Sequence, residues 1–212
     1  MKKIVILASG QGSNAESIIQ YAKHHHSYVV SAVISDQPDA GVLNLAASHG
    51  VQAWCLPKHK KETSATYHSR LLNLVNKFNP DWVVLAGYMR ILPEPFLKHF
   101  FDQNIQQSKV INIHPSLLPL YPGLKAYEKS FESGDSEYGF TIHYVDAGMD
   151  TGKIIFQHKL VRQKEISFEA YKQAGLKAEN YFYPRILASL IETGSPNLTD
   201  FNPNLSENLR EV

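Results

Sequence analysis

The sequence contains a single cysteine, Cys55, among its 212 residues. One cysteine excludes a disulfide within the chain and argues against a zinc–thiolate site, which draws on several thiolates. We therefore expect Cys55 to be a small buried residue of a strand. So little cysteine is typical of proteins in a reducing compartment, and a cytoplasmic location is expected.

Long apolar runs are missing as well. The apolar stretch after the first lysines covers residues 4–8, which is shorter than the roughly 7–15 residues of a signal-peptide core. No stretch approaches the length of a membrane span. Charge of one sign is also lacking, with 21 Lys plus Arg against 20 Asp plus Glu. Small molecules are therefore the expected partners, rather than nucleic acid or a membrane.

The sequence does show an alternation of short apolar runs with longer amphipathic segments. Strands are predicted at residues 3–8, 29–34, 52–55, 82–85, 110–114, 139–145 and 153–159. Helices are predicted at residues 13–24, 41–49, 61–78, 95–100, 126–132 and 167–192. This order predicts an α/β fold with a mostly parallel, twisted sheet of about seven strands and helices on both faces. Pro184 is expected to kink or break the last helix.

No internal repeat, low-complexity tract or linker divides the chain. We therefore expect a single domain over residues 1–193, which is a usual size for one α/β core. The remaining residues, 194–212, are polar and contain two prolines. They are expected to form a loose surface tail.

A glycine-rich turn, residues 9–14, follows the first strand. Glycine lets the backbone turn sharply and approach a ligand closely. Ser13 is expected to cap the following helix, and Glu16 to complete a capping box. The free N–H groups at such a helix start favour an anion, most simply a phosphate.

Three interpretations of this turn stay open on the sequence alone. The pattern Gly-x-Gly-x-x-Ala over residues 10–15, with Asp36 after the second strand, fits the loose dinucleotide-binding fingerprint. The second interpretation is a single terminal phosphate on a small substrate, with Ser13 and Asn14 as added donors. The third is a tight turn with a good cap and no ligand.

Asn112 and His114 lie two residues apart in the strand predicted at 110–114. Residues at this spacing point to the same face of a strand. The strand stops at Pro115, and ligands of open α/β sheets bind at the carboxyl ends of the strands. Residues 114–123 contain three prolines and a glycine, which indicates a rigid loop of the kind found beside active sites. Asn112 and His114 are therefore candidate functional residues.

A second polar segment, residues 140–152, is the candidate partner of this strand. Its strand ends in a loop that carries Asp146 and Asp150. An acid beside His114 would favour the protonated ring and raise its pKa. His143 lies within the strand, where a supporting hydrogen-bond role is expected.

These motifs together resemble the folate-dependent phosphoribosylglycinamide formyltransferase family of purine synthesis. The matching segments keep the family's order and spacing and are residues 12–14, 87–92, 112–119, 121–123 and 139–152. The resemblance extends to about Pro184. It implies a Rossmann-like domain that transfers the formyl group of 10-formyltetrahydrofolate to the amine of glycinamide ribonucleotide. Its N-terminal half would hold the ribonucleotide phosphate and its C-terminal half the folate.

The resemblance also implies roles for individual residues. The ribonucleotide would contact Gly12, Ser13, Asn14 and Glu179. The folate would contact Met89, Arg90, Ile91, Leu92, Asn112, Asp146 and Asp150. Asn112, His114 and Asp150 would be catalytic without a metal, and His143 would support them.

Two segments depart from the family pattern. Leu176 and Lys177 stand near Glu179 where polar residues are expected, although Lys177 could reach the phosphate. Ser64 stands where some members carry an arginine near the folate.

The expected chemistry is attack of an amine on the formyl carbon. Asn112 and a protonated His114 would donate hydrogen bonds to the oxyanion. Asp150 would orient and charge His114 and help to move the proton. A formyltransferase for another amine, such as an amino-sugar nucleotide, remains an alternative, as does a nicotinamide-dependent oxidoreductase built on the glycine turn. Either a monomer or a homodimer is compatible with the sequence.

Overall fold

A single seven-stranded sheet runs through the computed structural model, which describes residues 1–196. Its order is β3-β2-β1-β4-β7-β8-β9. The strands are β1 (Lys2–Leu7), β2 (Tyr28–Ser35), β3 (Gln52–Cys55), β4 (Trp82–Leu85), β7 (Val110–His114), β8 (Glu137–Tyr144) and β9 (Ile154–Val161). The pairs from β3 to β7 are parallel, whereas β8 and β9 run antiparallel to their neighbours. The predicted fold class is confirmed.

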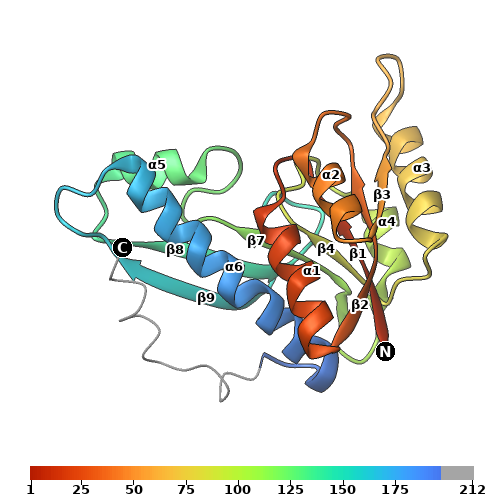
Figure 1. Ribbon diagram of the computed structural model, residues 1–212. Helices are drawn as coiled ribbons and strands as arrows, with labels where there is room; N and C mark the ends of the chain where they lie inside the picture. Colours follow the sequence, from red (N-terminus) through yellow and green to blue (C-terminus); the bar gives the residue numbers. More distant parts are fainter. Residues whose placement is uncertain (197–212) are drawn as a thin grey trace.

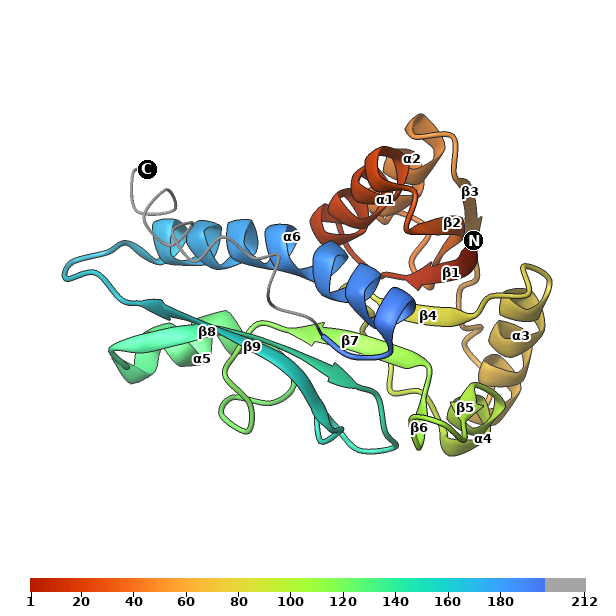
Figure 2. The ribbon, with the colours of Figure 1, turned by 90° about the horizontal axis from the view of Figure 1, so that it is seen from below.

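Helices cover both faces of the sheet (Figures 1 and 2). One face carries α1 (Ser13–His25), α2 (Gly41–Ser48) and α6 (Phe168–Thr193), and the other carries α3 (Ser64–Asn76) and α4 (Glu94–His99). The strands alternate accordingly, because Ile4 and Ile6 pack toward α1 and α6 whereas Val5 and Leu7 pack toward α3 and α4. A further helix, α5 (Ala126–Ser133), packs on α6 through Tyr127 and other aromatic rings.

Three local predictions differ from the structure, and one small sheet was not predicted. Ser13 is the first residue of α1, and its cap is Gly12 in the left-handed region without a side-chain hydrogen bond, so the capping box is wrong. Helix α6 is not broken at Pro184, because the residues around the proline are buried in the core and offset the lost bond. Cys55 is exposed, because β3 is an edge strand. A two-stranded sheet of β5 (Phe101–Asp102) and β6 (Gln107–Ser108) was not predicted, because each strand has only two residues.

The predicted tail falls mostly outside the described residues, which end at position 196. Within residues 1–196, no helix is long and apolar enough to cross a membrane.

The strand order reverses between β1 and β4. After β1 the chain moves outward to β2 and β3, and it then returns to β4 on the other side of β1. Such a switch point opens a crevice at the carboxyl ends of the strands. Tyr183 of α6 donates a hydrogen bond to the Leu85 carbonyl at the end of β4, at 2.9 Å. This bond fixes α6 beside the crevice.

The proline-rich loop that follows β7 is held by Thr141 of β8. The Thr141 hydroxyl donates to the Ser116 carbonyl at 2.7 Å and accepts from the Leu118 N–H at 3.0 Å. The Gln157 amide donates to the same hydroxyl at 2.9 Å. Ser116 also donates to the Leu120 carbonyl and so closes the loop on itself. The peptide bond between Leu118 and Pro119 is cis.

Replacing Thr141 by valine keeps the shape of the side chain and removes these hydrogen bonds. The Leu118 N–H and the Ser116 carbonyl then lose a buried partner, so the free energy of unfolding should fall by about 1–3 kcal/mol. Urea denaturation measures this change. As a control, Thr193→Val at the exposed end of α6 should change the free energy by less than about 0.5 kcal/mol. Equal losses in the two variants would contradict the role of Thr141.

Candidate active site

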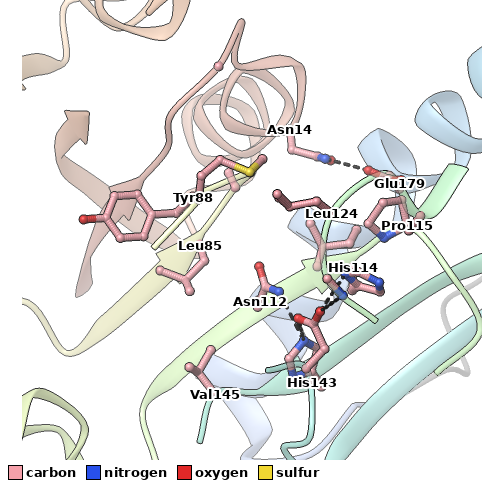
Figure 3. A pocket seen from close by; sticks show the side chains of 18 of the residues that line it. Asn14, Leu85, Tyr88, Asn112, His114, Pro115, Leu124, His143, Val145 and Glu179 are labelled. Atoms are coloured by element: carbon pink, nitrogen blue, oxygen red, sulfur yellow. Dashed lines mark hydrogen bonds and ion pairs between the residues drawn. The ribbon is translucent and has the colours of Figure 1, made fainter. Parts of the chain in front are cut away.

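A cleft of about 640 Å³ opens at the carboxyl ends of β1, β4 and β7 (Figure 3). This volume lies within the usual range of small-molecule sites, roughly 300–1,000 Å³. The predicted site residues that line it are Gly12, Ser13, Asn14, Met89, Arg90, Ile91, Leu92, Asn112, His114, His143, Asp146, Asp150 and Glu179. The fold therefore brings together residues that lie more than 160 positions apart in the chain, as the contact between Asn14 and Glu179 shows.

The glycine turn places backbone donors at one end of the cleft. The first bond of α1 runs from the Glu16 N–H to the Gly12 carbonyl at 2.8 Å. The preceding N–H groups, including those of Ser13 and Asn14, thus have no partner within the helix and can bind an anion. Gly12 has a φ of 93°, and a Cβ there would lie 2.6 Å from the Val42 side chain. Only glycine fits this position without displacing Val42.

Asn112 is held by His143, which lies directly opposite on β8. The His143 Nδ1 donates to the Tyr144 carbonyl at 2.8 Å, which fixes the ring. The Asn112 Nδ2 lies 3.1 Å from the His143 Nε2. The amide orientation is thereby fixed, and the second N–H of Asn112 remains for a ligand in the cleft.

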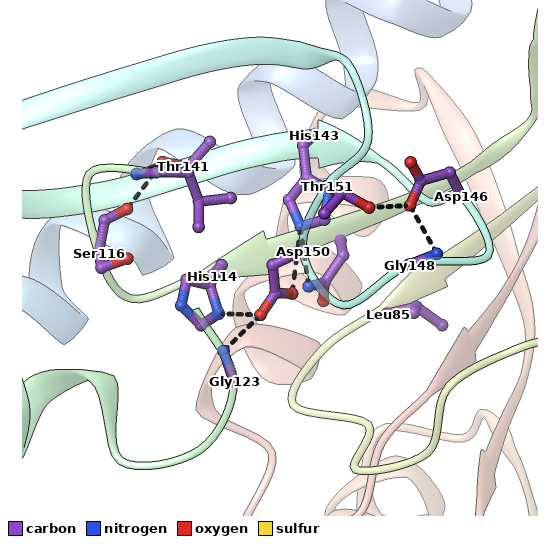
Figure 4. Close-up of polar contacts among 12 residues, drawn as sticks. Leu85, His114, Ser116, Gly123, Thr141, His143, Asp146, Gly148, Asp150 and Thr151 are labelled. Atoms are coloured by element: carbon purple, nitrogen blue, oxygen red, sulfur yellow. Dashed lines mark hydrogen bonds and ion pairs between the residues drawn. The ribbon is translucent and has the colours of Figure 1, made fainter. Parts of the chain in front are cut away.

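His114 lies against Asp150 at the base of the cleft (Figure 4). The His114 Nδ1 lies 3.2 Å from the Asp150 Oδ2, and its Nε2 lies 2.8 Å from the Tyr121 carbonyl. The Gly123 N–H donates to the same Asp150 oxygen at 2.8 Å. Asp150 has a φ of 56°, in the left-handed region that non-glycine residues seldom adopt.

Burial governs the charge of this pair. It lowers the pKa of His114, and the Tyr121 carbonyl and the Asp150 charge oppose this only in part. Burial also raises the pKa of Asp150, but contacts with His143, Gly123 and His114 outweigh it and keep that pKa below its usual value. Asp150 is therefore ionised and His114 neutral at pH 7. Asp150 raises the pKa of His114 as predicted, but the net shift is downward, because removal of the ring from water exceeds the attraction of the carboxylate.

Asp36 links the glycine turn to the loop that follows β4. Its carboxylate accepts from Arg90 at 2.7 Å and from the Ser9 hydroxyl at 2.6 Å. The Ser9 hydroxyl in turn accepts from the Met89 N–H at 3.0 Å. The Arg90 guanidinium also stacks over the Tyr67 ring. Asp36 is thus already bound by Arg90 and Ser9, which argues against its role as the ribose acid of a dinucleotide site.

Asp146 shapes the loop on the other side of the cleft. Its carboxylate accepts from the Gly148 N–H at 3.1 Å and from the Thr151 hydroxyl at 2.8 Å. The loop that carries Asp150 is closed by these two bonds (Figure 4).

The lysine that helix α6 places in the cleft is Lys172, not Lys177 as considered from the sequence. Lys177 lines a separate groove between α1 and α6, whereas Lys172, Leu176 and Glu179 line the cleft. Positions 172, 176 and 179 follow helical spacing, a signal that could have identified Lys172. Ser64 is the first residue of α3 and does not line the cleft.

Tyr127 is a cleft residue that sequence reasoning missed. Its hydroxyl donates a hydrogen bond to Glu179. No signal in the sequence distinguished it, because residues 126–132 have the pattern of an ordinary amphipathic helix.

Residues 2–187 match the model of the formyl transferase family. The chain belongs to this family. Among its relatives, the phosphoribosylglycinamide formyltransferase of Bacillus subtilis is 33% identical over 90% of this chain and 95% of its own length. The Escherichia coli protein of the same name is 38% identical over 74% and 72% of the two chains.

Solved structures of similarly named enzymes also resemble this chain. The phosphoribosylglycinamide formyltransferase of Bacillus halodurans superposes with a TM-score of 0.83 at 33% identity, covering 95% of this chain and 100% of that one. Glycinamide ribonucleotide transformylase 1 of Geobacillus kaustophilus gives 0.83 at 34% identity, covering 90% and 99%. Within residues 1–196, no group of three or more His, Cys, Asp or Glu side chains is placed to hold a metal ion.

Asp36→Asn tests whether the loop after β4 contacts the formyl donor. Arg90 loses its ionised partner, so the KM for this donor is expected to rise roughly tenfold, the size of one charge-assisted bond. Steady-state kinetics measures this change. Glu62→Gln removes a comparable arginine partner on α3, that of Arg70, and should leave the KM unchanged. A similar effect of both variants would show that the link is not specific.

Asp150→Asn should lower the pKa of His114 further, because the carboxylate charge is one of the two influences that raise it. The protonated ring would then appear only at a lower pH. NMR titration of the His114 ring measures this pKa directly, and kcat should fall by about 10²–10⁴-fold as general acid–base help is lost. An unchanged or increased pKa of His114 in this variant would contradict the charge balance described above.

Proposed function

We propose that this chain transfers the formyl group of 10-formyltetrahydrofolate to the amine of 5-phosphoribosylglycinamide. The products are formylglycinamide ribonucleotide and tetrahydrofolate, in purine biosynthesis. The observation that carries the proposal is the convergence of Asn112, His114 and Asp150 in one cleft that also contains an anion-binding helix start. The names of the relatives support the choice of substrates.

The ribonucleotide occupies the end of the cleft beside α1. Its phosphate accepts from the backbone N–H groups of the turn at Gly12, Ser13 and Asn14. Glu179 lies next to this turn and is held by Asn14 at 2.7 Å. A carboxylate repels phosphate and accepts from hydroxyls, so Glu179 contacts the ribose side of the ribonucleotide.

The folate occupies the end of the cleft between the loops at residues 89–92 and 146–150. Met89 and Ile91 are 61% and 52% exposed there, and Leu124 and Met149 are 68% and 53% exposed. These apolar side chains suit a flat ring system. The polar edge of the ring meets backbone groups of the same loops.

Asn112 stabilises the transition state. When the amine attacks the formyl carbon, the carbonyl oxygen becomes negative. The free N–H of the Asn112 amide donates to this oxygen, and the amide is already oriented by His143. Once the ring is protonated, the His114 Nδ1–H can donate a second hydrogen bond to this oxygen. Its contact with Asp150 is 3.2 Å long, so the hydrogen can be shared between the carboxylate and the oxyanion.

His114 and Asp150 move the proton. The attacking nitrogen gains a bond to carbon and must lose a proton, while the leaving N10 of the folate must gain one. Neutral His114 beside ionised Asp150 is a ready acceptor for the first proton, and the protonated pair can return it to N10. The lowered pKa of His114 favours this return.

The proposal is tested by incubating the purified chain with 10-formyltetrahydrofolate, with and without glycinamide ribonucleotide, and following tetrahydrofolate by absorbance. Product should form only when the ribonucleotide is present. Asn112→Ala should lower kcat by about 10²–10³-fold, because one oxyanion donor is lost.

Asn104→Ala, in the exposed turn between β5 and β6, is the control and should keep kcat within about twofold. Equal turnover without ribonucleotide would indicate a hydrolase. Faster turnover of an amino-sugar nucleotide would assign a different acceptor.

A further inference from the structure

Gly175 lies inside the 26-residue helix α6, where glycine costs about 1 kcal/mol relative to alanine. The structure shows what occupies the space of the missing side chain. A Cβ at position 175 would lie 2.4 Å from the Tyr127 hydroxyl oxygen and within 2.8 Å of two carbons of its ring. The Tyr127 ring thus packs against α6 in the space that Gly175 leaves open.

This packing lets Tyr127 reach Glu179, one turn further along α6. The Tyr127 hydroxyl donates to one oxygen of the Glu179 carboxylate, and the Asn14 amide donates to the other. Side chains from α5 and α1 therefore hold both oxygens of a carboxylate that is only 3% exposed (Figure 3 shows the bond from Asn14). The carboxylate lines the cleft beside the anion-binding turn.

The surroundings of Glu179 oppose its charge. Burial raises the pKa of this carboxyl, and the hydrogen bonds from Tyr127 and Asn14 lower it in part. The titratable groups that face it are Tyr127 from α5 and Tyr183 from its own helix, and Lys172 and His114 line the same cleft. Without the Tyr127 hydroxyl, Asn14 alone would offset burial, and Glu179 would protonate at a higher pH.

We propose that Tyr127 is a positioning residue for the ribonucleotide, which holds the Glu179 carboxylate in place and aimed at the ribose hydroxyls, and that Gly175 provides the space for it. This inference rests on the proposed function. It predicts that the hydroxyl of Tyr127 affects the binding of the ribonucleotide and leaves the formyl transfer step and the folate unaffected.

Tyr127→Phe tests the hydroxyl. The KM for glycinamide ribonucleotide at pH 7 should rise roughly tenfold, the size of one hydrogen bond to a charged group, while kcat and the KM for 10-formyltetrahydrofolate stay within about twofold. Tyr171→Phe is the matched control. Its buried hydroxyl bonds to Ser130 at 2.6 Å in the same aromatic cluster, so its loss should leave all three constants unchanged.

The pH dependence separates positioning from general damage. A higher pKa of Glu179 in Tyr127→Phe means that the carboxyl is protonated over more of the range. The ribonucleotide KM of this variant should therefore rise as the pH falls and approach the wild-type value as the pH rises. A purely structural defect would not reverse with pH.

Gly175→Ala fills part of the space that the Tyr127 ring occupies and keeps the Tyr127 hydroxyl. Alanine favours the helix, yet its Cβ displaces the Tyr127 ring, so the ribonucleotide KM should rise as in Tyr127→Phe. In the double variant the two effects should not add, because both act through one contact.

Calorimetric titration with glycinamide ribonucleotide alone measures binding without turnover. An unchanged affinity in Tyr127→Phe at every pH, or an equal loss in Tyr171→Phe, would overturn the inference. Wild-type binding without formyl transfer would overturn the proposed function and leave the inference standing. Absence of wild-type binding would overturn both.

Discussion

The position of one carboxylate, that of Asp150, determines the rest of the site. One of its oxygens lies against the His114 ring and the Gly123 N–H, and the other faces His143 at 3.6 Å. These contacts join the loop after β7 to the loop after β8, and they hold Asp150 in a left-handed conformation that its own backbone disfavours. A shift of this carboxylate would remove partners from His114 and from the Gly123 N–H together.

The two ends of the cleft are connected by buried polar contacts. Asp36 joins the glycine turn to the loop after β4, and Glu179 joins the same turn to α5 and α6. Both acids are only 3% exposed, so each carboxylate depends on hydrogen bonds from its protein partners in place of water. The glycine turn is thereby fixed from two sides before any substrate arrives, which lowers the entropy lost on binding.

The strands and the shared face of Asn112 and His114 could be predicted because each depends on local pattern. Five apolar runs gave the parallel strands, and the two-residue spacing of Asn112 and His114 placed them on one face. The charge of His114 could not be predicted, because it follows from the balance of burial against Asp150, and the sequence contains no measure of burial. The same limit explains Cys55, whose strand lies at the edge of the sheet, and Tyr127, whose ring position depends on the space at Gly175.

The apolar rim of the cleft determines how a ligand is held there. Met89, Ile91, Leu124 and Met149 keep more than half of their surface in water in this structure. A flat ring that settles among them releases that hydration, and the loss of exposed apolar surface gives a negative heat-capacity change. Affinity at this end of the cleft should therefore vary with temperature as a hydrophobic contact does. At the opposite end, backbone N–H groups would bind the phosphate of a ligand, so affinity there should depend on salt concentration instead.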